Sequence, residues 1–189
     1  MRHVRAIETD RLVLRRLCIE DGARISHFTS DLAVARMTSR IPHPHPVSAA
    51  EGFVLIMRAR EALGRDHVFA IDLRGEGLVG LIGAHQGEGA RHEIGYWLGR
   101  PFWGQGLASE ALGAFLGKAR NLGALEAGHF EDNPASGRVL EKAGFVYTGD
   151  IAPQFSLARG HAVPCRQMVF EDGAKSREQI GGARCAADA

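Results

Sequence analysis

The sequence is poor in cysteine and has no long apolar run. Its 189 residues hold three cysteines, Cys18, Cys165 and Cys185, which are widely spaced and form no Cys-x-x-Cys pair. This usage argues against a disulfide framework and a zinc site. His43 and His45 alternate with prolines but lack a third ligand, so no metal is expected. The apolar runs are far shorter than a membrane helix, and the charged start MRHVRAIETDR is unlike a signal peptide, so we expect a cytoplasmic protein with no membrane partner.

The chain also lacks an excess of charge of either sign. Its 23 Lys and Arg residues balance 22 Asp and Glu residues, for a net charge of +1, and no basic block is present. Binding to nucleic acid through its phosphates is therefore not expected. The length and the 45% hydrophobic content predict a single domain with a sizeable core over residues 1–170. The polar, small-residue stretch 171–189 predicts a loosely ordered tail.

The hydrophobic pattern predicts an α+β fold, a mixed and mostly antiparallel sheet of about seven strands with helices on both faces. Strands are predicted over residues 12–17, 67–73, 78–85, 92–98, 124–130, 145–151 and 162–170, of which the second to fourth form an antiparallel meander. Helices are predicted over residues 19–28, 48–63, 104–122 and 133–143, and Ser48 with Glu51 forms a capping box for the second. The prolines of IPHPHPV make that stretch a loop.

The most informative segment is YWLGRPFWGQGLASEAL, residues 96–112, where a strand meets a helix through a glycine-rich turn. Gly104 and Gly106 let the backbone approach an anion closely, and Ala108 and Ser109 open a helix whose first N–H groups have no partner inside the helix. Those donors and the positive end of the helix dipole favour phosphate groups. A Gly-x-Gly before a helix also occurs as a plain turn, so the segment alone is a weak indication of a ligand.

A second segment, NPASGRVLEKAGF at residues 133–145, strengthens that indication. Together the two segments resemble the GCN5-related N-acetyltransferase (GNAT) family, and within it the RimJ/RimL-like branch that acetylates the N-termini of ribosomal proteins. The resemblance extends from TDRLVLRRL at residues 9–17 to VPCRQMVF at residues 163–170. It implies that the chain is an enzyme that transfers acetyl from acetyl-coenzyme A (acetyl-CoA) directly to a primary amine.

The resemblance also implies which residues bind the coenzyme. The family's phosphate turn has Arg or Gln, two residues, Gly, one residue, then Gly or Ala. Gly106 and Ala108 match the last two positions, whereas Trp103 replaces the Arg or Gln, and we favour packing of Trp103 onto the sheet over ligand contact. An N–H near Tyr96 or Trp97 is expected to polarise the acetyl carbonyl. The expected set is Tyr96, Trp97, Leu98, Trp103, Gly104, Gln105, Gly106, Leu107, Ala108, Ser109, Asn133, which also caps its helix, and Ser136.

Two residues are candidates for proton transfer. An α-amino group has a pKa of about 8, so the reaction needs a proton acceptor. We favour Glu93 over His92, because strand side chains alternate and only one of the two faces the cleft; a chain of water molecules is the alternative. Many family members protonate the departing thiolate with a Tyr where this chain has Leu140. The resembling branch instead uses a Ser at the position of Ser136, whose hydroxyl we expect to face the cleft freely.

Several alternatives stay open at this point. The acceptor is a protein N-terminus, a small-molecule amine or an antibiotic, and its choice is expected to depend on loops at residues 36–47 and 153–161. The missing Tyr also allows a coenzyme-binding module without turnover. A dinucleotide site fits poorly, because that motif follows the first strand of a parallel unit and here a meander precedes the turn. A homodimer is a further open alternative.

Overall fold

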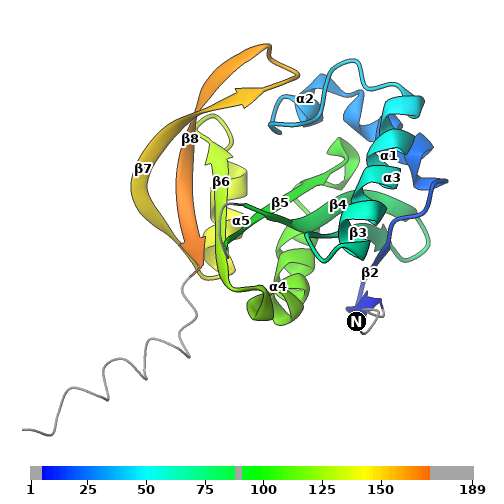
Figure 1. The fold of residues 1–189 in the computed structure, drawn as a ribbon, viewed down its shortest axis with the longest axis horizontal. Helices are drawn as coiled ribbons and strands as arrows, with labels where there is room; N and C mark the ends of the chain where they lie inside the picture. Colours follow the sequence, from blue (N-terminus) through cyan, green and yellow to red (C-terminus); the bar gives the residue numbers. More distant parts are fainter. Residues whose placement is uncertain (1–5, 88–90, 171–189) are drawn as a thin grey trace, which may run out of the picture.

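The computed structural model describes residues 6–87 and 91–170, so Cys185 and the tail predicted over residues 171–189 lie outside the described residues. One sheet has the strand order β1-β2-β3-β4-β5-β6-β8-β7 (Figure 1). All neighbouring strands are antiparallel except β5 and β6, which confirms the mixed sheet. The strands are β1 (Ile7–Glu8), β2 (Leu12–Arg16), β3 (Asp66–Leu73), β4 (Gly77–Gln86), β5 (Arg91–Leu98), β6 (Ala124–Phe130), β7 (Phe145–Ser156) and β8 (His161–Phe170).

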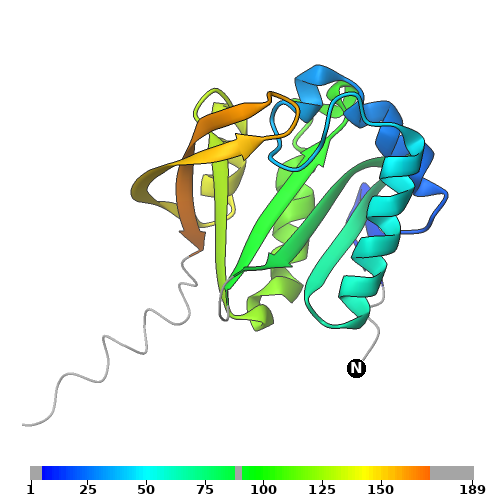
Figure 2. The same cartoon turned by 45° about the horizontal axis from the view of Figure 1, so that its top comes forward.

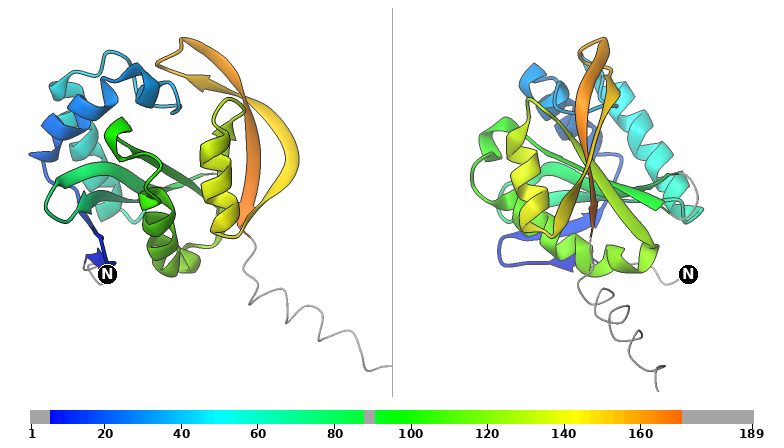
Figure 3. Two further views of the ribbon diagram at one scale, coloured as in Figure 1. Left: turned by 180° about the vertical axis from the view of Figure 1, so that it is seen from behind. Right: turned by 90° about the vertical axis from the view of Figure 1, so that its left-hand side faces the viewer.

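Helices cover both faces of this sheet, as Figure 3 shows from two sides. They are α1 (Asp21–Thr29), α2 (Leu32–Ala35), α3 (Val47–Ala62), α4 (Leu107–Ala119) and α5 (Pro134–Lys142), with short 3-10 turns at Arg100–Phe102 and Arg120–Leu122. Helices α1 and α3 pack on one face against β3 and β4, and α4 and α5 pack on the other. Across the described residues, no helix is both long and apolar enough to cross a membrane.

Each face buries its own apolar cluster. Helix α4 buries the stripe that its periodicity predicts, Leu107, Ala111, Leu112, Phe115, Leu116 and Ala119. This stripe packs against alternate residues of the central strands, among them Phe69 and Ile82. On the opposite face Ile25 and Val54 pack against the intervening residues. Because side chains alternate along a strand, the central strands are buried on both faces and hold the two layers of helices together.

The helix starts differ from the prediction at α1, which begins at Asp21 rather than residue 19, and at α3 and α4. Helix α3 begins at Val47, after Pro46, and the capping box of Ser48 and Glu51 does not form. The carbonyl oxygen of Pro46 instead accepts hydrogen bonds from the N–H groups of Ala49 and Ala50. Helix α4 begins at Leu107 rather than residue 104, because the glycines before it take a left-handed backbone. The short α2 and β1 were missed, since two to four residues carry too little periodicity to indicate an element.

The end of β7 also corrects the prediction. The loop expected over residues 153–161 is strand as far as Ser156, and His161 already belongs to β8, so only residues 157–160 form the turn. Pro153 is tolerated in β7 because this strand lies at the edge of the sheet, where a missing N–H breaks no ladder with a further strand. The β7–β8 hairpin is therefore longer than the sequence suggested, with strand pairing that continues to Ser156 and His161 (Figure 2).

The remaining cysteines and histidines singled out in the sequence have structural surroundings. Cys18 and Cys165 are free thiols, and Cys165 is buried on β8. Nε2 of His43 lies 3.0 Å from the carbonyl oxygen of Ser30. Nδ1 of His45, which is buried, lies 2.7 Å from the hydroxyl of Thr29. The two histidines thus secure the loop before α3 to helix α1.

Candidate active site

The parallel pair of β5 and β6 is joined over only part of its length. Residues Arg91 to Ile94 pair with Ala124 to Ala127, and in the described strands the pairing stops there, although β5 continues to Leu98 and β6 to Phe130. Figure 2 shows the two strands separating toward their C-terminal ends. Peptide groups of both strands therefore face each other without a ladder between them, at the end of the sheet where α4 begins.

The turn between β5 and α4 presents free backbone donors. Gly104 and Gly106 have φ angles of 73° and 76°. Within residues 6–87 and 91–170, no group accepts a hydrogen bond from the N–H of Gln105, Gly106, Leu107, Ala108 or Ser109. A Cβ atom at Gly104 would meet nothing within 4 Å, so the space before the turn is open. Such an array at a helix N-terminus fits a diphosphate, the group that acetyl-CoA would place there.

An arginine that the sequence did not single out lies beside this turn. Nη1 of Arg11 donates to the carbonyl oxygen of Gln105 at 3.0 Å, and its Nη2 lies 3.7 Å from where a Cβ of Gly106 would be. Glu110 holds Arg11 through an ion pair of 2.6 Å and accepts a hydrogen bond from Thr9. Burial acts to raise the pKa of Glu110, but these hydrogen bonds lower it below its ordinary value. Arg11 thus adds positive charge beside the free N–H groups.

Trp103 does not pack the helix start onto the sheet as predicted. Its side chain is 44% exposed, and its indole N–H donates to the carbonyl oxygen of Leu98 at 2.7 Å. The bond closes the turn between β5 and α4 without burying the ring. Leu98 and Leu107 are buried at 6% and 1% exposure, so only their backbone is available to a ligand. Trp97 packs with the opposite apolar cluster, under α1 and α3.

Ser136 and Tyr96 form a hydroxyl pair between helix α5 and strand β5. Oη of Tyr96, on β5, lies 2.9 Å from Oγ of Ser136 on α5 and donates to the Ser136 carbonyl oxygen at 3.0 Å. The Ser136 hydroxyl is therefore not free, which corrects the prediction. Burial raises the pKa of Tyr96 to about 12, against a smaller opposing effect of the hydrogen bond to Ser136, so the phenol remains protonated. Asn133 accepts a hydrogen bond from the Ser136 N–H and caps α5 as predicted.

Glu93 and His92 lie on opposite faces of β5. His92 is buried on the face that α4 covers, next to the ring of His67. The Glu93 side chain is 46% exposed on the α1 and α3 face and accepts a hydrogen bond of 3.1 Å from Arg40. A Cβ atom at Gly95, two residues on along that face, would meet nothing within 4 Å. Glu93 thus borders open space beside the separated strands, whereas His92 belongs to the core.

Two features together define a GNAT-type acyltransferase. One is the mixed sheet whose parallel strands β5 and β6 separate beyond Ile94, and the other is the turn with free N–H groups between β5 and α4. The chain belongs to this family, since the model of the acetyltransferase (GNAT) domain matches residues 11–146. It is 31% identical over 149 residues to the uncharacterized N-acetyltransferase YoaA of Bacillus subtilis, which covers 76% of this chain and 84% of YoaA. The chain is thus an N-acetyltransferase by family.

Solved structures share the same fold. An acetyltransferase from Salmonella typhimurium that modifies the N-terminal serine of ribosomal protein L7/L12 superposes with a TM-score of 0.74 at 19% identity, over 88% of this chain and 99% of that one. The microcin C7 self-immunity acetyltransferase MccE, in complex with acetyl-CoA and AMP, gives 0.73 at 14% identity, over 85% and 92% of the two chains. At sequence identities this low, the structural likeness shows that the fold is shared, and it shows nothing about the acceptor.

Proposed function

We propose that the protein transfers acetyl from acetyl-CoA to the α-amine at the N-terminus of a protein or peptide. The observation that carries this proposal is the row of unpartnered N–H groups at residues 105–109, in the turn and first residues of α4 that follow β5. Strand β5 itself carries the exposed carboxylate of Glu93 and separates from β6 beyond Ile94. The likeness of the fold to the Salmonella enzyme that modifies an N-terminal serine supports the choice of acceptor.

The proposed coenzyme site uses the backbone more than side chains. The N–H groups of Gly104, Gln105, Gly106, Leu107, Ala108 and Ser109 would hold the diphosphate, with Arg11 beside them. Acetyl-CoA supplies the thioester that is attacked. The unpaired N–H groups of β5 beyond Ile94 would face the acetyl carbonyl and stabilise the negative charge that develops on its oxygen. Asn133, at the start of α5, lies across the gap from β5 and would contact the coenzyme.

The proposed proton transfers involve Glu93 and Ser136. At neutral pH an α-amine is mostly protonated, so Glu93 accepts one proton, directly or through a water molecule. The neutral amine then attacks the thioester carbonyl, the C–N bond forms and the C–S bond breaks. The second proton lost by the nitrogen is transferred to the departing thiolate, so the products are the amide and free coenzyme A with a thiol. Oγ of Ser136 would donate to the departing sulfur, and Oη of Tyr96 would then donate to Oγ instead of to the Ser136 carbonyl oxygen. The partnership with Tyr96 supplies a phenol that the sequence pattern lacked at Leu140.

A small-molecule amine is the second candidate acceptor. The fold matches MccE, a self-immunity acetyltransferase, as well as it matches the ribosomal-protein enzyme. The non-enzymatic alternative is a module that binds acetyl-CoA without transferring its acetyl group.

Three further predictions from the sequence stay predictions. They are the single domain over residues 1–170, the cytoplasmic location and the homodimer.

A panel of acceptors tests these alternatives. Peptides with a free N-terminal Ser or Ala, the same peptides with a blocked N-terminus and an internal Lys, and small amines are incubated with acetyl-CoA, and release of free coenzyme A and acetylation are measured by thiol assay and mass spectrometry. We expect acetylation of the free N-termini. Transfer only to small amines would move the acceptor to that class, and binding of acetyl-CoA without transfer to any amine would contradict the enzymatic proposal.

A further inference from the structure

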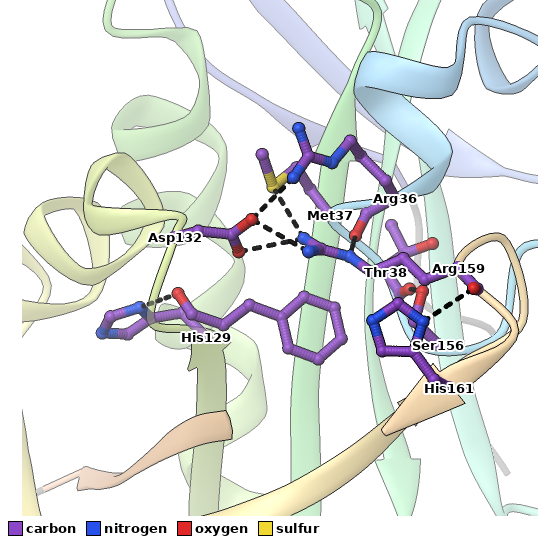
Figure 4. Close-up of polar contacts among 9 residues, drawn as sticks. Arg36, Met37, Thr38, His129, Asp132, Ser156, Arg159 and His161 are labelled. Carbon is purple, nitrogen blue, oxygen red and sulfur yellow. Dashed lines mark hydrogen bonds and ion pairs between the residues drawn. The ribbon is translucent and has the colours of Figure 1, made fainter. Parts of the chain in front are cut away.

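Asp132 lies where three segments far apart in the sequence meet, as Figure 4 shows. It follows β6 and precedes the Asn133 cap of α5. Its carboxylate accepts a hydrogen bond of 2.8 Å from Arg36, just after α2, and two of 2.9 Å from Arg159, in the β7–β8 turn. One carboxylate thus joins the end of α2, the start of α5 and the tip of the hairpin.

Arg159 is the most extensively bonded member of this group. Its side chain is only 11% exposed and its guanidinium lies over the ring of Phe130 at 5.1 Å. Besides Asp132, it donates to the carbonyl oxygen of Arg36 at 2.7 Å and contacts the sulfur of Met37. A planar guanidinium that makes charge-assisted bonds in two directions holds its partners more rigidly than a lysine would. The hydrogen bonds from Arg159 lower the pKa of Asp132, so its carboxylate is ionised at neutral pH.

The hairpin also holds the residues that follow Arg36. The hydroxyl of Ser156 donates to the carbonyl oxygen of Thr38 at 3.0 Å, and the N–H of Leu157 donates to that of Ser39 at 3.0 Å. The next residue is Arg40, whose guanidinium bonds Glu93. An unbroken series of contacts therefore runs from Asp132 through residues 36–40 to the carboxylate that borders the open face of β5.

We propose that Asp132 is a positioning residue for acceptor binding, which ties residues 36–40 to the β7–β8 turn and so sets where Arg40 stands beside Glu93. The inference rests on the proposed function, in which Glu93 meets the acceptor amine. The exposed pair of Arg40 and Glu93 is weak enough for an incoming ammonium group to replace Arg40. The bonds from Asp132 to Arg36 and Arg159 hold the segment of residues 36–40 in place even when Arg40 has left Glu93. The acceptor therefore binds to a surface that is already ordered, which reduces the entropy lost on binding.

Hydrogen exchange tests the structural half of this proposal without any ligand. In the Asp132→Asn protein, which keeps the shape of the side chain but loses its charge, amides of residues 36–40 and 156–160 should exchange at least about threefold faster, because two charge-assisted contacts are weakened. Amides of β4 should be unchanged. Glu61→Gln is the matched control, since Glu61 also holds an arginine, Arg16, through two hydrogen bonds but joins α3 to β2. Equal exchange in the wild-type and Asp132→Asn proteins would overturn the proposal.

Kinetics test the functional half. With a peptide that has a free N-terminal Ser as acceptor, Asp132→Asn should raise the acceptor KM about 3- to 10-fold, while kcat and the KM for acetyl-CoA stay within about twofold. Equal rises in both KM values, or an unchanged acceptor KM, would contradict a role in acceptor positioning. Failure of the wild-type protein to acetylate any amine would instead contradict the proposed function, and the exchange comparison would still decide whether Asp132 holds the segment.

Discussion

Glu93 and His92 show at the scale of single residues how strand alternation separates a surface group from a core group. Both are titratable and adjacent, and the sequence offered both as proton acceptors. The alternation of β5 buries His92 under α4 and leaves Glu93 half exposed opposite His85 of β4. A general base must be within reach of the incoming amine, so we expect the exposed Glu93 rather than the buried His92 to accept the proton.

Replacing Glu93 by Gln should lower kcat/KM at pH 7 by about 100-fold or more, because general bases contribute roughly 10²- to 10⁴-fold. The loss should shrink above about pH 8, where the α-amine is already neutral in solution. Steady-state kinetics of peptide acetylation between pH 6.5 and pH 9.5 measures this. His92→Gln should lower kcat/KM by a smaller factor, and that factor should not change with pH. A deficit of Glu93→Gln that is the same at all these pH values would indicate a structural role.

At the scale of elements, the turn before α4 depends on conformations that only glycine adopts easily. Gly104 and Gly106 both have positive φ, and the backbone they shape points the first N–H groups of α4 outward. Arg11, just before β2, fixes the same turn from outside through Gln105 and Glu110. The ligand site is thus a property of the β5-turn-α4 unit and its neighbour rather than of one side chain.

Gly106→Val should weaken acetyl-CoA binding by at least about tenfold, because its side chain would lie between the guanidinium of Arg11 and the free N–H groups, where the diphosphate is proposed to bind. Isothermal titration calorimetry measures this affinity. Gly75→Val is the matched control, since Gly75 has a similar φ of 86° and open space around it, but lies in the β3–β4 turn. Both variants carry the backbone strain, so only the loss specific to Gly106 reports on the ligand. Equal affinity of the two variants would refute the assignment.

At the scale of the whole molecule, a partly buried ion-pair network holds the N-terminal layer together. The Arg15 guanidinium, on β2, donates two hydrogen bonds of 2.8 and 2.9 Å to Asp21 of α1 and one of 2.8 Å to Asp72 of β3. Asp21 is 5% exposed and also accepts the N–H of Cys18. Burial acts to raise the pKa of Asp21, but the bonds from Arg15 and Cys18 lower it below its usual value. None of the hydrogen bonds of this network involves the turn before α4, so we assign it to stability.

Asp21→Asn should reduce the free energy of unfolding at pH 7 by about 2 kcal/mol, because Arg15 loses one of its two charged partners and keeps only Asp72. A carboxylate whose pKa is lower in the folded state stabilises the fold above its unfolded pKa of about 3.9, and that contribution disappears as pH falls through the folded value. The difference between wild type and Asp21→Asn should therefore be constant from pH 7 to about pH 5 and shrink below about pH 4 in urea unfolding. Glu8→Gln, at an exposed pair with Arg74, should change stability little.

Most of the fold could be predicted from periodicity. The meander, the buried stripe of α4 and the Asn133 cap are local patterns, and the structure confirms them. The misplaced boundaries fall where a neighbouring residue overrides propensity, as Pro46 does at α3 and as the edge position does for Pro153 in β7. The site residues stay predictions: the structure gives Gly104 and Gly106 positive φ angles and leaves the Glu93 side chain exposed, as the proposed roles require.

The sequence by itself determined the donor-rich turn and the family, because glycine conformation and helix ends depend on neighbours along the chain. Only the tertiary structure decided that the Ser136 hydroxyl bonds Tyr96, that Arg11 stands beside the turn, and that Asp132 joins Arg36 to Arg159. These contacts link residues 27 to 96 positions apart. Their geometry depends on how the strands and helices pack, which a single chain's local pattern does not encode.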